Sequence, residues 1–159
     1  MSWHEPDLTR ELAALIDRYV GYSATMDFAG KRALWDKDDP HILLMPEEDR
    51  APHAGWDAIN QYWKDWSAVM EYIRSAAANH AARHIAPGIA LCFYDMRWIA
   101  RLHTAKKPVS GDVRVTSWWR QKPEGWRLFQ LIESPLDGAA RMRLAEERAA
   151  AALFGTPPV

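Results

Sequence analysis

A long β-hairpin between residues 76 and 103 constrains the fold of this chain more than any other stretch. Two runs of strand-forming residues flank Pro87-Gly88, and proline followed by glycine is typical of a type II turn. If the connection has four residues, Ala86-Pro87-Gly88-Ile89, the residues that pair across the two strands have numbers that sum to 175. The pairs predicted in this way are His84 with Leu91, Ala82 with Phe93, His80 with Asp95, and Ala78 with Arg97.

The alternation of side chains gives this hairpin two different faces. One face is polar and ionisable and carries His80, His84, Asp95, Arg97, Ile99, Arg101 and His103. The other face is apolar and carries Cys92, Tyr94, Met96, Trp98 and Leu102. Two arrangements fit this pattern. Either the apolar face packs on the core and the charged face meets water, or the charged face lines a pocket.

Composition limits the classes of protein to which the chain can belong. Its 159 residues fit one domain, 1–159, and the net charge of -1 gives no electrostatic reason to expect a nucleic acid partner. The single cysteine, Cys92, and the absence of a charged-then-apolar leader make a cytoplasmic location the expectation, with Cys92 as a buried, inert thiol. No apolar run approaches the ~20 residues that cross a bilayer. Nine tryptophans fit either an oversized core or a pocket for an aromatic ligand.

Hydrophobic periodicity predicts helices first and long strands afterwards, an α+β plan. The predicted helices begin at Asp7 or Thr9, at Asp27 and at Trp56, and they end near residues 26, 35 and 72. The predicted strands outside the hairpin cover residues 41–45, 112–121 and 126–134. In the last pair, the expected partners are Trp119 with Leu128, Ser117 with Gln130, and Arg114 with Glu133. The core covers about 7–135, and a further helix is expected at about 138–154.

Three stretches resemble the nuclear transport factor 2-like superfamily, in particular its SnoaL-like branch. They are Tyr19 through Trp35, the segment from Pro46 to Trp66 with Gly55-Trp56-Asp57-Ala58-Ile59, and Val113 to Ser134 with its Trp118-Trp119 pair. The resemblance implies a cone-shaped, curved antiparallel sheet wrapped over the N-terminal helices, an α+β barrel. It is specific for the fold but not for the activity, since the family includes dehydratases, isomerases, cyclases, epoxide hydrolases and non-catalytic modules.

Comparison with the family suggests a catalytic histidine. Scytalone dehydratase-like members have one near the start of the strand after the third helix, and Asn79-His80 holds that place here. Together with the predicted register, this makes His80 a candidate acid-base residue oriented by Asp95. The alternative is that His80 and Asp95 form a surface ion pair that contributes little. The epoxide hydrolase pattern is not met, because Asp95-Met96-Arg97 has the reverse order and the last strand has Gln130 and Glu133 but no aspartate.

The remaining candidate residues would bind substrate. Arg97 and Tyr22, or Tyr19 one turn earlier, could hold substrate oxygens. The candidates for the pocket wall are His84, Phe93, Trp66, Trp118 and Ile99. For each of them, the alternative is an ordinary core or surface role.

The sequence therefore predicts an enzyme of lyase, dehydratase or isomerase type, without cofactor or metal. Its substrate would be a small aromatic molecule, lignin-derived or polyketide-like. The alternative is a non-catalytic small-molecule-binding or assembly module of the same fold. We also expect a homodimer through the sheet face bearing Tyr94, Met96 and Trp98, because a large exposed apolar surface favours association.

Overall fold

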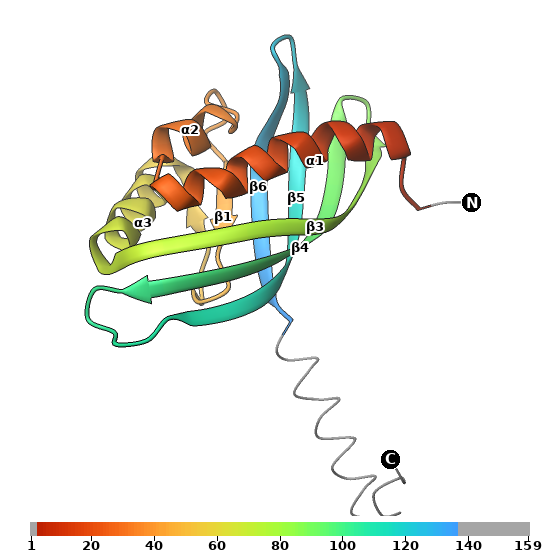
Figure 1. The fold of residues 1–159 in the computed structure, drawn as a ribbon. Coiled ribbons are helices and arrows are strands. Elements are labelled where there is room, and N and C mark those ends of the chain that lie inside the picture. Colours follow the sequence, from red (N-terminus) through yellow and green to blue (C-terminus); the bar gives the residue numbers. More distant parts are fainter. Residues whose placement is uncertain (1–2, 137–159) are drawn as a thin grey trace, which may run out of the picture.

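The computed structural model describes residues 3–136, in which three helices precede the long strands (Figure 1). The elements are α1 (Pro6–Gly21), the 3-10 helix η1 (Tyr22–Thr25), α2 (Phe28–Ala33), β1 (Leu43–Met45), β2 (His53–Ala54), α3 (Gly55–Val69), β3 (Met70–Ala86), β4 (Ile89–Leu102), β5 (Val109–Lys122) and β6 (Gly125–Pro135). The predicted order is confirmed. The third helix ends three residues earlier than expected, since Met70 already begins β3. The helix expected at 138–154 lies outside the described residues.

The sheet is curved and has the strand order β2-β1-β6-β5-β4-β3. All neighbouring strands are antiparallel except β1 and β6, which are parallel. Because β2 and β3 are edge strands that do not pair with each other, the sheet does not close into a barrel. The α+β fold with a curved sheet over N-terminal helices is therefore confirmed, in an open form.

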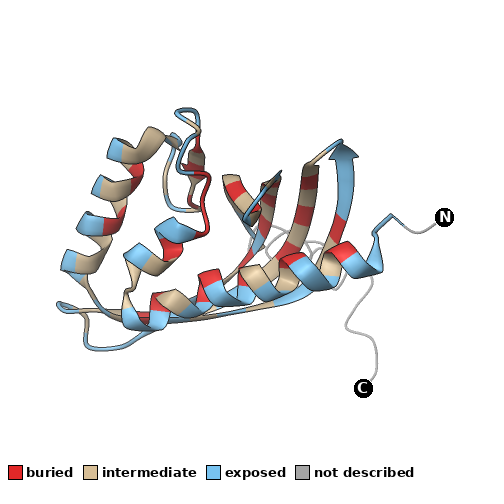
Figure 2. Ribbon diagram, turned by 90° about the horizontal axis from the view of Figure 1, so that it is seen from above, coloured by how far each residue is buried: buried red, intermediate tan, exposed pale blue. Residues whose placement is uncertain are grey.

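Helix α1 lies along β3 (Figure 1) and packs through residues at helical spacing. Its buried side chains are Leu8, Leu12, Ile16, Tyr19 and Val20, and they recur along the helix in Figure 2. Asp27 caps α2, because its Oδ1 accepts a hydrogen bond of 2.8 Å from the amide of Gly30. The prediction that Asp27 opens this helix is confirmed.

The pairing of β3 with β4 differs from the predicted register because β3 contains extra residues. At the Pro87-Gly88 turn, Ala86 pairs with Ile89 as expected, and Gly88 has the positive φ of 68° that this turn requires. Bulges then shift the pairing by one residue near Ile85 and by another at Asn79-His80, so that Asp95 pairs with Ala78. The predicted His80–Asp95 pair is therefore wrong. Asn79 adopts φ 56°, a left-handed conformation that asparagine tolerates better than most residues.

The bulge at Asn79-His80 also changes which residues of β3 face the helices. Before it, the inward residues are odd-numbered, as in Ile73, and after it they are even-numbered, as in Ala82. On β4, Cys92 and Tyr94 are buried, whereas Arg97 is exposed. The apolar face of β4 therefore points to the helices and the ionisable face points away. The pocket assignment of the ionisable face was wrong, and the side chains expected at a dimer interface lie inside. The homodimer itself stays a prediction.

A further bulge separates the two ends of the β5–β6 pair. Trp119 pairs with Leu128 as predicted, but Trp118 pairs with Gln130, which leaves Phe129 as the extra residue of β6. Beyond this bulge Glu133 pairs with Val115 and not with Arg114. Since Val115 is fully buried and directly opposed side chains share a face, the bulge turns Glu133 inward.

Candidate active site

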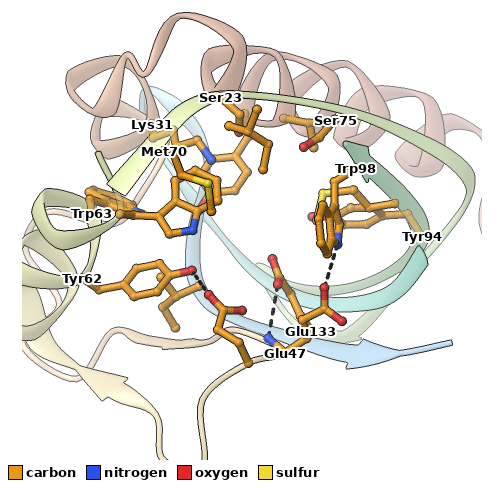
Figure 3. A pocket seen from close by; sticks show the side chains of 17 residues that line it. Ser23, Lys31, Glu47, Tyr62, Trp63, Met70, Ser75, Tyr94, Trp98 and Glu133 are labelled. Carbon is orange, nitrogen blue, oxygen red and sulfur yellow. Dashed lines mark hydrogen bonds between the residues drawn. The ribbon is translucent and has the colours of Figure 1, made fainter. Parts of the chain in front are cut away.

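A cavity of about 430 Å³ lies between the helices and the concave face of the sheet (Figure 3). Six of its seventeen lining residues are aromatic, and they are Tyr19, Tyr62, Trp63, Trp66, Tyr94 and Trp98. Its ionisable lining residues other than the tyrosines are Lys31, Glu47, Glu48 and Glu133. A mostly apolar hollow of this size with a few polar groups is the usual form of a small-molecule site.

Glu133 of β6 brings a carboxyl group into this aromatic environment. Burial first, and then the neighbouring carboxylate of Glu48, raise its pKa from 4.5 to about 7, while the Glu47 amide and Lys31 oppose the shift. The amide of Glu47 is 3.4 Å from Oε2 of Glu133. At neutral pH this group is therefore close to an equal mixture of acid and carboxylate.

Two more glutamates follow β1 and are held by aromatic donors. The indole N–H of Trp98 donates a hydrogen bond of 2.6 Å to Oε1 of Glu47. The hydroxyl of Tyr62 donates one of 2.7 Å to Oε1 of Glu48, which is exposed at the edge of the cavity. Figure 3 shows both contacts together with the one from Glu47 to Glu133. Burial, together with these two neighbouring carboxylates, explains why Glu133 stays protonated to a higher pH than an ordinary glutamate.

Lys31 of α2 is the cationic residue of the cavity lining. Only 8% of the residue is accessible, and its Nζ lies 4.4 Å from the centre of the Tyr19 ring. Burial lowers the pKa of Lys31 to about 8, although the nearby Glu133 favours the charged form. Burial also raises the pKa of Tyr19 and of Tyr94, so both phenols are neutral hydrogen-bond donors at any ordinary pH.

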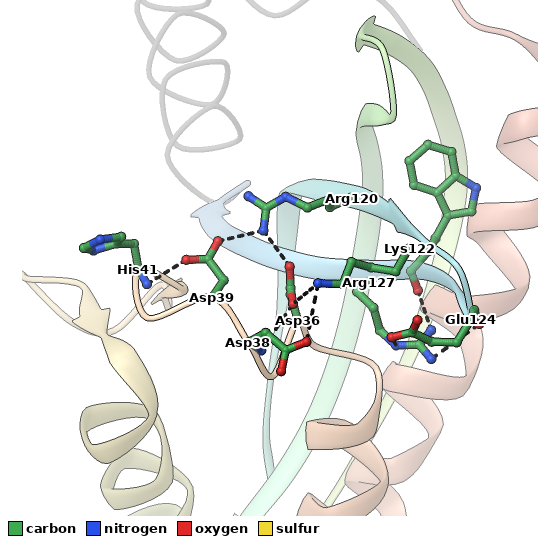
Figure 4. A network of polar contacts seen from close by, with 9 residues as sticks. Asp36, Asp38, Asp39, His41, Arg120, Lys122, Glu124 and Arg127 are labelled. Carbon is green, nitrogen blue, oxygen red and sulfur yellow. Dashed lines mark hydrogen bonds and ion pairs between the residues drawn. The ribbon is translucent and has the colours of Figure 1, made fainter.

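A buried ion-pair network anchors the segment that joins Lys31 to the Glu47-Glu48 pair (Figure 4). Asp36, 1% exposed, accepts a hydrogen bond of 2.5 Å from Arg120 and one of 3.2 Å from Lys122 of β5. Arg120 also donates to Asp39 at 2.9 Å. Burial alone would raise the pKa of Asp36, but the two cations outweigh it and hold that pKa below its ordinary value. The network fixes this chain segment to β5.

Among the predicted site residues, Trp66 lies where it was expected. It lines the cavity beside Tyr62, with ring centroids 6.4 Å apart. Tyr22 does not line the cavity, whereas Tyr19, named with it as an alternative, does. Tyr22 begins η1 and its hydroxyl is 3.5 Å from the guanidinium of Arg18 at the surface.

His80 faces the helices but lies behind the cavity wall. Its ring stacks on Tyr94 with centroids 5.7 Å apart, and Nε2 is 3.7 Å from Oδ1 of Asp17, too far for a hydrogen bond. Burial lowers the pKa of His80, and Asp17 opposes this effect. The predicted orientation of His80 by Asp95 is absent. The bulge turns His80 toward the helices, whereas Asp95 pairs with Ala78 and lies on the outer face.

Asp95 and Arg97 lie on the outer face of the sheet, away from the cavity. Asp95 accepts a hydrogen bond of 2.8 Å from the side chain of Asn79 and is 3.9 Å from the guanidinium of Arg114. Arg97 forms an ion pair of 2.7 Å with Asp112. The arrangement on which their predicted catalytic roles depended is therefore not formed.

The other predicted pocket residues also lie outside the cavity lining. His84 pairs with Glu5 at 2.8 Å near the N-terminal end of α1, and Ile99 is exposed. Phe93 packs against Trp3, with ring centroids 5.1 Å apart. Trp118 faces away from the helices because Trp119 is 1% exposed and packs in the core. The expected inert thiol is found, since Cys92 is buried and burial raises its pKa to about 12.

Sequence reasoning missed the ionisable residues of the cavity. Glu133 was noted as a departure from the epoxide hydrolase pattern and as the expected partner of Arg114, and it was not named as a site residue. Lys31 sits in a short charged helix, where a solvated lysine is the usual outcome. One signal was available for the glutamates, since Glu47-Glu48 directly follows a strand stopped by proline and precedes an aromatic helix.

Two features are absent from residues 3–136. No three His, Cys, Asp or Glu side chains are grouped so that they could hold a metal ion. No helix in this part of the chain has both the length and the apolar character needed to cross a membrane.

Solved structures with the same architecture come from several bacteria. An NTF2-like superfamily protein from Salmonella enterica serovar Typhimurium is 19% identical, with a TM-score of 0.71 over 82% of this chain and 92% of that chain. A candidate dehydratase of the NTF2-like family from Streptomyces avermitilis is 16% identical, with a TM-score of 0.72 over 82% and 99%. A candidate scytalone dehydratase from Novosphingobium aromaticivorans is 9% identical, with a TM-score of 0.71 over 80% and 83%. At these identities the likeness shows the fold alone.

Family membership follows from the sequence itself. None of the curated proteins compared with the chain matches it. The profile of the SnoaL-like domain matches residues 12–138. This range contains all the residues that line the cavity, from Tyr19 to Glu133. The chain therefore belongs to the family of SnoaL-like domains.

Proposed function

We propose that this protein is a cofactor-independent acid-base enzyme of lyase, dehydratase or isomerase type. The observation that supports this most is Glu133, a carboxyl group whose pKa burial raises to about 7 inside an aromatic cavity. A catalytic acid or base works best when its pKa is near the operating pH. The candidate dehydratases among the structures of the same fold are consistent with this class of reaction.

A small aromatic molecule is the substrate that the cavity suits best. The cavity volume of about 430 Å³ is within the range of sites for small ligands. Tyrosine and tryptophan side chains offer flat apolar surfaces on which an aromatic ring can stack. Figure 3 shows Glu47 and Glu133 together and Lys31 on another part of the wall, so a ligand bearing one or two oxygens would be oriented by these two polar places.

The proposed chemistry is a proton transfer supported by neighbouring donors. As a carboxylate, Glu133 would remove a proton from carbon, and as an acid it would return a proton to carbon or to a leaving hydroxyl. Negative charge that develops on a substrate oxygen would be stabilised by the Lys31 ammonium or by the hydroxyl of Tyr19 or Tyr94. A positioned acid-base group contributes roughly 100- to 10,000-fold to the rate.

The test is a pH profile of turnover with a set of small hydroxylated and keto aromatic compounds. The ratio kcat/KM should change with an apparent pKa of about 7, and Glu133→Gln should lower kcat at least 100-fold while the ligand still binds. Glu11→Gln, which removes an exposed carboxylate of α1, is the matched control and should leave kcat unchanged. Binding without turnover in any compound would favour the non-catalytic binding module instead.

A further inference from the structure

Lys31 presents an amine to the cavity, and none of the carboxylates in residues 3–136 lies within ion-pair distance of it, although Glu133 is near enough to favour its charged form. Among the described residues its side chain forms no ion pair or hydrogen bond. Its Nζ lies 4.4 Å from the centre of the Tyr19 ring. Helix α2, which carries it, is fixed by the Asp27 cap at one end and by the Asp36 network beyond the other. A buried lysine is normally paired with a carboxylate, so this arrangement calls for an explanation.

The environment of Lys31 also changes its reactivity. With a pKa of about 8, about a quarter of the Lys31 side chains carry a neutral amine at pH 7.5, against about one in a thousand for an ordinary lysine. The neutral amine is the nucleophile that reacts with carbonyl compounds, and desolvation in an apolar pocket is a known way to activate it. The titratable groups that share the cavity with it are Tyr19, Glu47, Glu48, Tyr62, Tyr94 and Glu133.

We infer that Lys31 is a covalent binding site for small aromatic aldehydes and ketones, which it captures as an imine. In the first step the nitrogen lone pair attacks the carbonyl carbon, a C–N bond forms as the π bond of the carbonyl breaks, and the oxygen takes up the proton lost by nitrogen, which gives a carbinolamine. In the second step the nitrogen lone pair forms the C=N bond and the C–O bond breaks. The oxygen leaves as water with a proton from the carboxylic acid of Glu133, which leaves a protonated imine and the Glu133 carboxylate. No oxidant or reductant is consumed.

This inference goes beyond the proposed proton transfer. It requires a carbonyl ligand to enter the cavity, but it does not require turnover. Glu133 lines the same cavity as Lys31 and has a pKa of about 7, so a fraction of it is protonated when a fraction of Lys31 is neutral. An ordinary glutamate with a pKa of 4.5 could not supply that proton at the pH where the amine reacts.

The experiment is reductive trapping on the full-length protein. Benzaldehyde and sodium cyanoborohydride are added at pH 7.5, and the modified lysine is located by peptide mass spectrometry. The chain has six lysines, and Lys37, Lys64, Lys106 and Lys107 are exposed, so they act as internal references. We expect one adduct per chain, with Lys31 modified at least ten-fold faster than these four. Modification of Lys31 at or below the rate of the exposed lysines would overturn the inference.

Two further measurements make the result specific. The rate at Lys31 should be highest between about pH 7 and pH 8, where a fraction of Lys31 is neutral and a fraction of Glu133 is protonated, and benzyl alcohol, which has the same ring but no carbonyl, should slow it by competition. Lys31→Arg keeps the charge and should lose the fast adduct, whereas Lys64→Arg should keep it. If Lys31→Arg does not fold, the site is still identified in the wild-type protein by the peptide map.

The outcomes also separate this inference from the proposed function. Turnover that depends on Glu133, without trapping at Lys31, would overturn the imine and leave the proton transfer standing. Fast trapping at Lys31 without turnover of any compound would support the imine and contradict the proposed enzyme.

Discussion

Replacing Glu133 with glutamine should change how the stability of the protein depends on pH. The glutamine keeps the size of the side chain but has no titratable proton. In the wild-type protein burial raises the pKa of Glu133 from 4.5 to about 7, so the folded state holds a proton that the unfolded state has already released between these values. Folding therefore becomes less favourable as the pH rises through this window.

The size of the effect follows from the two pKa values. One pKa unit corresponds to about 1.4 kcal/mol, so a rise from 4.5 to about 7 gives a loss of about 2 to 3 kcal/mol between pH 5 and pH 8. The lowered pKa of His80 acts in the opposite direction, but it contributes equally to wild type and variant. The difference between the two proteins therefore reports the titration of Glu133 together with its electrostatic coupling to Lys31.

Urea unfolding at several pH values measures this difference directly. The free energy of unfolding of Glu133→Gln, relative to that of wild type, should rise by about 2 to 3 kcal/mol from pH 5 to pH 8, with unchanged m-values. Glu11→Gln, at an exposed position, should follow the wild-type profile. Parallel profiles for wild type and Glu133→Gln would show that the carboxyl group titrates as in water, and the reasoning on the cavity would be refuted.

Three further substitutions test the framework around the cavity. Asp36→Asn should lower the free energy of unfolding by about 3 kcal/mol in urea titrations, because two cations lose a buried carboxylate; a loss below ~1 kcal/mol would contradict this. Gly111→Ala would place a Cβ 2.7 Å from Cζ2 of Trp98, so the indole should move away from Glu47. The affinity for aromatic ligands, measured by calorimetry, should therefore fall, and an unchanged affinity would contradict the role of Trp98 in the cavity wall. Asp27→Ala should cost about 1 kcal/mol in thermal unfolding and Asp27→Asn much less, and equal losses would show that the cap does not matter.

The sequence by itself determined the order of the elements and the position of the turns. Pro87-Gly88 fixes a turn whose φ values only a few residues tolerate, and Asp27 begins α2 through its own side chain. These are local effects that depend on residues close together in the chain. The alternation along β4 likewise showed that one face is apolar and the other ionisable.

Only the tertiary structure decided which of these faces meets the cavity and which ionisable residues enter it. A single extra residue in a strand reverses the direction of every side chain beyond it, and the bulges at Asn79-His80 and Phe129 each do this. Their positions depend on hydrogen bonds with partner strands and on packing against α1, which a pattern within one strand does not record. For this reason His80 was separated from Asp95, and Glu133 was brought inward.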